Sequence, residues 1–188
     1  MAKVIRKKGP GAARLEHLLA ELDGDMHVKV GFPESAKYPD KNATPVAYVA
    51  VIQENGVEEL GIPPRAFFAA TILRCLEKWT EVVETGAKAV AAGKASARAV
   101  LAKLGSLAVL DVKQSIREMN DPPLAASTIK ARERKMNKQT AEEEKAMTES
   151  GRKSSGKVVK TTDNPLQETE YMLNHVTFVV EDGKGDAE

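Results

Sequence analysis

Two long apolar patterns at helical spacing constrain the fold more than any other feature of this sequence. The first can begin only after Pro63-Pro64, because proline disfavours helical backbone in the residue before it. This helix is expected to end near Gly86, and Gly93 is a second possible end. The next pattern starts at Ser96, a residue suited to cap a helix, and runs to about residue 119. Two amphipathic helices of this length either pack against each other or cover one face of a sheet. The apolar positions of the first lie one turn apart: Phe68, Ile72, Leu76, Trp79 and Val83.

Two short segments near the ends of the chain alternate between apolar and polar residues. Residues 26–32 and 176–180 both have the period of a half-buried strand. They should pair with each other, because an isolated strand is not stable. The sequence therefore predicts an α+β fold: a small antiparallel sheet packed against long amphipathic helices, with a flexible charged loop.

Shorter helices are expected on either side of the two long ones. A leucine pattern over residues 15–22 predicts one, and residues 124–136 and 166–174 predict two more. Another should follow Thr44 as N-cap, with Gly56 in a left-handed conformation at its end.

The length of 188 residues suits a single domain with one core. We expect this domain over residues 11–182, with a flexible basic arm at 1–10 and a polar tail at 183–188. Residues 138–162 are dominated by Lys, Glu, Thr, Ser and Gly, so they cannot bury much apolar surface. This stretch is predicted to be a mobile loop within the domain.

The composition excludes several classes of protein. The 28 basic and 27 acidic residues nearly cancel, so any contact with nucleic acid would have to be local. The one cysteine, Cys75, excludes an internal disulfide and is expected to be a buried thiol. No apolar run approaches the roughly 20 residues that span a bilayer, so no membrane association is expected.

The motifs of common enzyme sites are absent from the sequence. It has no glycine-rich phosphate loop, no HExxH, no paired-cysteine motif and no GxSxG, so we expect neither catalysis nor a cofactor. If the two strands pair, His27 and His175 could approach each other and form a weak metal or base site. The alternative is that both are ordinary surface or interface histidines.

A basic cluster is the best local case for nucleic acid. It could neutralise several phosphates, but no aromatic residue is interleaved with it, so any DNA contact would be independent of sequence. The alternative is an ordinary solvated helix face. The cluster consists of Lys130, Arg132, Arg134, Lys135 and Lys138.

The segment at residues 62–68 suggests a contact of a different kind. Its Pro-Pro step fixes the chain direction, and Arg65 offers a planar fork of donors. Phe67 and Phe68 point to different sides of the helix that follows. One ring can belong to the core while the other meets a neighbour, or both can be buried in the same subunit.

Five short segments, in this order, resemble the tail-completion or neck protein family of tailed bacteriophages, of the HK97 gp10-like and virion-morphogenesis type. The similarity spans about residues 28–180. One departure is that relatives commonly carry a Thr-Gly pair after the late Pro-Leu, where this chain has Glu168-Thr169-Glu170. The segments are Val30-Gly31-Phe32-Pro33, Pro45-Val46-Ala47-Tyr48-Val49-Ala50 running into Gln53-Glu54-Asn55-Gly56, Ile62-Pro63-Pro64-Arg65-Ala66-Phe67-Phe68, Pro122-Pro123-Leu124 with Thr128, Ile129 and Arg132, and Asn164-Pro165-Leu166 with Thr169, Met172, Leu173 and Val176.

The resemblance implies a non-catalytic subunit of a ring at the head-proximal end of the tail, assembled in the host cytoplasm and kept in the virion. Its implied partners are further copies of itself, a tail-terminator or tail-tube protein, and a head-connector or portal-side protein. Ring assembly uses heterologous contacts that close by rotation. The candidate contacts are Tyr48, Arg65, Phe67, Phe68 and the 138–162 loop, with the basic cluster as a possible non-specific DNA contact.

Overall fold

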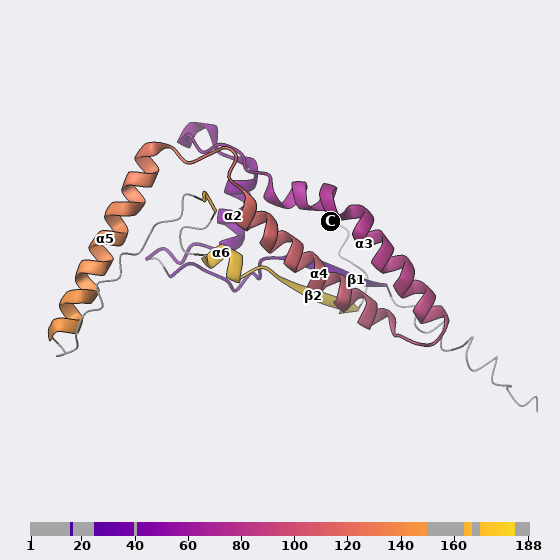
Figure 1. The fold of residues 1–188 in the computed structure, drawn as a ribbon. Helices are drawn as coiled ribbons and strands as arrows, with labels where there is room; N and C mark the ends of the chain where they lie inside the picture. Colours follow the sequence, from indigo (N-terminus) through magenta and orange to yellow (C-terminus); the bar gives the residue numbers. More distant parts are fainter. Residues whose placement is uncertain (1–15, 17–24, 40, 150–163, 167–169, 183–188) are drawn as a thin grey trace, which may run out of the picture. The chain divides into compact units, whose positions relative to one another are not determined.

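The structure, a computed structural model, describes residues 16, 25–39, 41–149, 164–166 and 170–182 (Figure 1). The helix expected over residues 15–22 lies outside this part except for Glu16, as do the two terminal tails and residues 150–162 of the expected loop.

The chain divides into two compact units by its internal contacts. Unit 1 comprises Met1–Pro33, Ala69–Val112 and Val176–Glu188, and unit 2 comprises Glu34–Phe68 and Lys113–His175. Two long helices are continuous across the boundaries between them. The division into two units and the continuity of these helices point in opposite directions for the number of domains. The expectation of one domain over residues 11–182 therefore stays a prediction.

The sheet of unit 1 joins two segments from near the ends of the chain. Strand β1 (Met26–Gly31) pairs antiparallel with β2 (Thr177–Asp182), and Val28 lies opposite Val180 in the register. The pairing predicted from the two alternating segments is therefore confirmed, and the fold is α+β.

The two long helices are α3 (Phe67–Ala91) and α4 (Ala97–Glu118), which lie side by side in unit 1 (Figure 1). Helix α3 does not end near Gly86 as expected. A Cβ atom at Gly86 would lie 2.2 Å from Val100 Cγ1, so this glycine permits close packing on α4 and does not terminate the helix. The chain turns at Gly93, where φ is +68°, and Ser96 Oγ then accepts a hydrogen bond from Ala99 N–H at 3.2 Å, as its capping role predicts.

Helix α4 also packs on the sheet. A Cβ atom at Gly105 would lie 2.3 Å from Phe178 Cδ2 and 2.9 Å from Val28 Cγ2. The two arrangements left open by the sequence, helix against helix and helix against sheet, therefore both occur in unit 1. Apart from Asp111, its buried side chains are small and mostly aliphatic: Thr71, Cys75, Val90, Ala108, Val112 and Val176.

Unit 2 begins with α2 (Val46–Asn55) and the 3-10 helix η1 (Glu58–Leu60). The N-cap of α2 is Pro45, not Thr44, because Pro45 has an extended ψ of 135°. Gly56 ends the helix with φ of +71° but ψ of 172°, so it is outside the left-handed helical region predicted for it. A side chain there would collide with the chain that returns past it, since a Cβ atom would lie 2.6 Å from Pro64 N.

Helix α5 (Ala126–Glu149) corrects the expectation of a loop that begins at residue 138. The sequence over 138–149 lacks apolar residues for a core, but it is rich in Lys, Glu, Gln and Ala, which are strong helix formers. Low apolar content predicts poor burial and does not exclude an exposed helix. The final helix, α6 (Tyr171–Asn174), is shorter than the predicted 166–174.

The core of unit 2 is also aliphatic, with a single fully buried ring. Its buried apolar side chains come from the loop before α2, from α2, from the adjoining ends of α3 and α4, and from residues 166 and 172–173: Ala36, Val46, Ala50, Phe67, Ile116, Leu166, Met172 and Leu173. Among the described residues, no helix has the length and apolar character needed to cross a bilayer.

The Gly105 contact yields a stability prediction. Gly105→Ala should lower the free energy of unfolding by about 1–3 kcal/mol, because the added methyl group overpacks the interface of α4 with Phe178. Urea denaturation followed by circular dichroism measures the change. The matched control is Gly31→Ala, where an added Cβ meets nothing within 4 Å, and its effect should stay within about 0.5 kcal/mol. Equal stability of the two variants would contradict the close packing.

Candidate interaction surfaces

The Arg65 side chain lies inside unit 2 and joins two loops to α2. It is 5% exposed. Its Nε donates to the carbonyl oxygen of Pro122 at 3.1 Å, and Nη1 donates to Gln53 Oε1 at 3.3 Å. The Arg65 backbone N–H also donates to the Gln53 carbonyl oxygen at 2.8 Å. Burial lowers the pKa of Arg65, and the positive charge of Arg132 lowers it further.

Arg132 forms a second buried clamp, between α5 and the segment that precedes α6. It is 8% exposed, and its Nη1 and Nη2 donate to the carbonyl oxygens of Asn164 and Pro165 at 2.9 and 3.0 Å. Asn164 Nδ2 in turn donates to the carbonyl oxygen of Arg117, near the end of α4, at 2.6 Å. These bonds fix which side of α5 faces the body of unit 2.

The two phenyl rings of the 62–68 segment have different environments. Phe67 is 1% exposed, and its carbonyl oxygen accepts from Ser115 Oγ at 3.0 Å. Phe68 is half-buried, its N–H donates to Glu54 Oε2 at 2.9 Å, and the two rings meet edge to face at 6.3 Å. Of the alternatives left open by the sequence, the one with Phe67 in the core and Phe68 partly accessible matches this arrangement.

The candidate contact residues therefore separate into two groups. Arg65, Phe67 and Arg132 are buried and bonded within unit 2, so they stabilise its fold. Tyr48 is 60% exposed and is accessible to a partner. The remaining members of the basic cluster are exposed on α5: Lys130, Arg134, Lys135 and Lys138.

In unit 1, the buried carboxylate of Asp111 links α4 to α3, a contact that the sequence analysis missed. Asp111 Oδ1 accepts from Lys78 Nζ at 2.7 Å, and Oδ2 accepts from Trp79 Nε1 at 2.8 Å. Burial raises the pKa of Asp111, but the hydrogen bonds from Lys78 and Trp79 outweigh this effect, and the net pKa is below its usual value. The only sequence feature that could have pointed to it is a carboxylate within the apolar stripe of α4.

One face of α3 is apolar but not buried. The sequence analysis placed Ile72, Leu76 and Val83 in one apolar pattern of this helix, and they are 40%, 54% and 42% exposed. Leu73 is 80% exposed. These four residues, named here the α3 apolar face, are more than a scatter of single exposed side chains.

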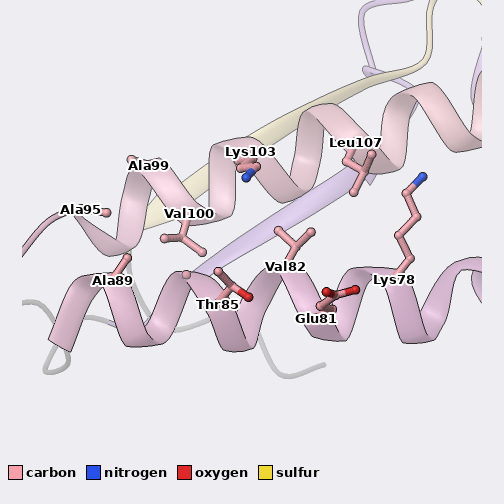
Figure 2. A pocket seen from close by; sticks show the side chains of 11 residues that line it. Lys78, Glu81, Val82, Thr85, Ala89, Ala95, Ala99, Val100, Lys103 and Leu107 are labelled. Carbon is pink, nitrogen blue, oxygen red and sulfur yellow. The ribbon is translucent and has the colours of Figure 1, made fainter. Parts of the chain in front are cut away.

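A groove runs between α3 and α4 in unit 1 (Figure 2). It encloses about 550 Å³, and Lys78 and Lys103 lie at its rim. Several of its lining residues are small or branched, which suits the close helix contact at Gly86: Val82, Ala89, Ala95, Ala99 and Val100.

The structure places the two histidines of the metal-site hypothesis in different units, each with its own partner. His27 Nε2 lies 3.1 Å from Glu181 Oε2 across the strand pair. His175 stacks on Tyr171 with ring centroids 4.1 Å apart, and its Nδ1 is 2.7 Å from the Tyr171 carbonyl oxygen. Within the described ranges, no group of three or more His, Cys, Asp or Glu side chains could hold a metal ion.

No family model, curated protein or solved structure matches this chain. The resemblance to the tail-completion family therefore stays a prediction from the five sequence segments.

The Asp111 network predicts a pH-dependent effect. Asp111→Asn should lower the free energy of unfolding at pH 7 by about 1.5–3 kcal/mol, because the hydrogen bonds lose their charged acceptor. A lowered pKa stabilises the folded state above the unfolded-state pKa, and this stabilisation is lost as the pH falls through the folded-state pKa. The difference between variant and wild type should therefore shrink toward about pH 3. A constant difference across urea titrations at both pH values would contradict the assignment.

The Arg132 clamp predicts a contrast between neighbouring arginines on α5. Arg132→Lys should lower the free energy of unfolding by about 1.5–3 kcal/mol, because an ammonium group cannot reach both carbonyl oxygens with a planar fork. Arg134→Lys, the same change at an exposed position, should stay within about 0.5 kcal/mol. Comparable thermal melts for the two variants would show that the clamp contributes little.

Proposed function

We propose that this chain is a structural subunit of a tailed bacteriophage, which forms a ring in the neck and joins the tail to the head. The observation that carries the proposal is the arrangement of the resembling segments. Four of the five segments are linked by hydrogen bonds in unit 2. Arg65 bonds to Gln53 and, 57 residues away, to Pro122. Arg132 bonds to the carbonyl oxygens of Asn164 and Pro165. The proposal is supported by the order of these segments in the sequence together with their hydrogen bonds to one another in unit 2.

In this proposal the protein acts through contacts that its exposed surfaces make with other proteins. The α3 apolar face in unit 1 and the exposed Tyr48 and Val51 on α2 in unit 2 are the candidates for contacts with neighbouring copies. A contiguous exposed apolar patch is a mark of an interaction site. In a ring, each copy would present one such face and receive a different one, since heterologous contacts close by rotation.

Helix α5 is the candidate contact with the other partners, a tail-terminator or tail-tube protein and a head-connector or portal-side protein. It continues for 17 residues beyond the Arg132 clamp, a rise of about 25 Å. Its described side chains after the clamp are exposed or half-exposed. A long polar helix held at its base can extend toward a neighbour without contributing to the subunit core.

Loss of this chain from the phage that encodes it should leave separate heads and tails, because the joint would lack a subunit. Electron microscopy of lysates measures this, and wild-type protein supplied in trans should restore joined particles. Joined, infectious particles formed without the chain would rule the proposal out.

The same complementation assay tests the α3 apolar face. The double variant Leu73→Glu/Leu76→Glu should fold but fail to restore particles, because buried charge would oppose contact between copies. The control is Leu60→Glu, at a position in unit 2 that is 70% exposed, and it should restore them. If the double variant restores particles as well as the control does, the α3 apolar face is not the subunit contact.

A further inference from the structure

The outer side of α5 carries a row of positive charges without intervening carboxylates. Lys130, Arg134 and Lys138, named here the basic stripe, follow one another at intervals of four residues, so they lie on one face of the helix. All three are exposed. The acidic side chains Glu133 and Glu142 lie on the flanks of this face. The other residues of the face are neutral and small or polar: Ser127, Ala131, Asn137 and Ala141.

The buried clamp determines that this stripe faces outward. Arg132 is two residues from Lys130 and from Arg134, which places it on the opposite side of the helix from both. Its bonds to Asn164 and Pro165 hold that opposite side against unit 2. One arginine of the cluster thus orients the helix and leaves three cations on the solvent side.

The spacing of the stripe is unfavourable for an isolated helix. Like charges four residues apart repel each other, and the pairs Lys130–Arg134 and Arg134–Lys138 both have this spacing. Glu133 and Glu142 lie three and four residues from Lys130 and Lys138 and offset part of this repulsion, whereas Arg134 has no carboxylate at either spacing. A ligand that removes this repulsion is one with several regularly spaced negative charges.

We propose that the basic stripe of α5 binds the phosphate backbone of double-stranded DNA, independently of base sequence. From Lys130 to Lys138 the helix rises about 12 Å, which is close to the width of the DNA major groove, so the outer two cations can reach phosphates of both strands. The stripe carries no aromatic side chain for base stacking. It carries no large apolar side chain for insertion into a bilayer either, which favours a phosphate polymer over a lipid surface. This inference does not depend on the proposed neck function.

Fluorescence anisotropy with a labelled 30-base-pair duplex tests the inference in the full chain. Three neutralised phosphates give a slope of about −2.7 for log affinity against log salt, equivalent to about a 40-fold loss of affinity between 50 and 200 mM salt. A second duplex of scrambled sequence should bind equally. The triple variant Lys130→Gln/Arg134→Gln/Lys138→Gln should bind at least about tenfold more weakly at 50 mM salt, with a slope near zero.

The matched control removes the same charge from other exposed positions. The variant Lys41→Gln/Lys88→Gln/Lys94→Gln takes the formal net charge from +1 to −2, as the stripe variant does, and should keep wild-type affinity and slope. Circular dichroism should show that both variants are folded. Equal loss in both variants would mean that the whole-molecule charge binds DNA and would overturn the inference. So would absence of wild-type binding at 50 mM salt, or binding to vesicles with 30% anionic phospholipid but not to the duplex.

Discussion

The burial of two guanidinium groups in unit 2 is the constraint on which its structure depends. A charged group can be buried only where its hydrogen-bond donors have acceptors. Here Arg65 donates to the carbonyl oxygen of Pro122, and Arg132 donates to those of Asn164 and Pro165. Carbonyl oxygens in loops lack the hydrogen-bond donors that a helix or sheet provides. The same bonds therefore supply acceptors to the guanidinium groups and donors to the loop carbonyl oxygens. Loops that carry little apolar surface of their own are thereby held to α2 and α5.

Unit 1 uses a complementary device. There the buried charge is the carboxylate of Asp111, and its donors come from two successive residues of α3, Lys78 and Trp79. Glycines at 86 and 105 let α4 approach α3 on one side and the sheet on the other. With close backbone contact on two sides, α4 is the central element of unit 1, and α3 keeps one apolar face without cover in the described chain.

Local sequence patterns predicted the helices and strands of this chain better than they predicted how these elements pack. The structure confirms the two strands, the two long helices, the cap at Ser96 and the buried thiol of Cys75. These features could be predicted because each depends mainly on residues close together in the sequence. The loop expected from residue 138 was wrong, because apolar content measures potential burial and not helix propensity. The end expected at Gly86 was wrong because a glycine that breaks a helix and one that admits a neighbouring helix look alike in sequence.

The sequence by itself determined the two strands, the two long helices and the order of the resembling segments, since these depend on residues close together along the chain. Only the tertiary structure decided that Arg132 is buried while Lys130 and Arg134 face solvent, because the partners of Arg132 lie more than thirty residues away. It likewise decided that Ile72 and Leu76 remain partly exposed. An amphipathic pattern states which face of a helix is apolar, whereas the presence of a neighbour to cover that face depends on chain topology.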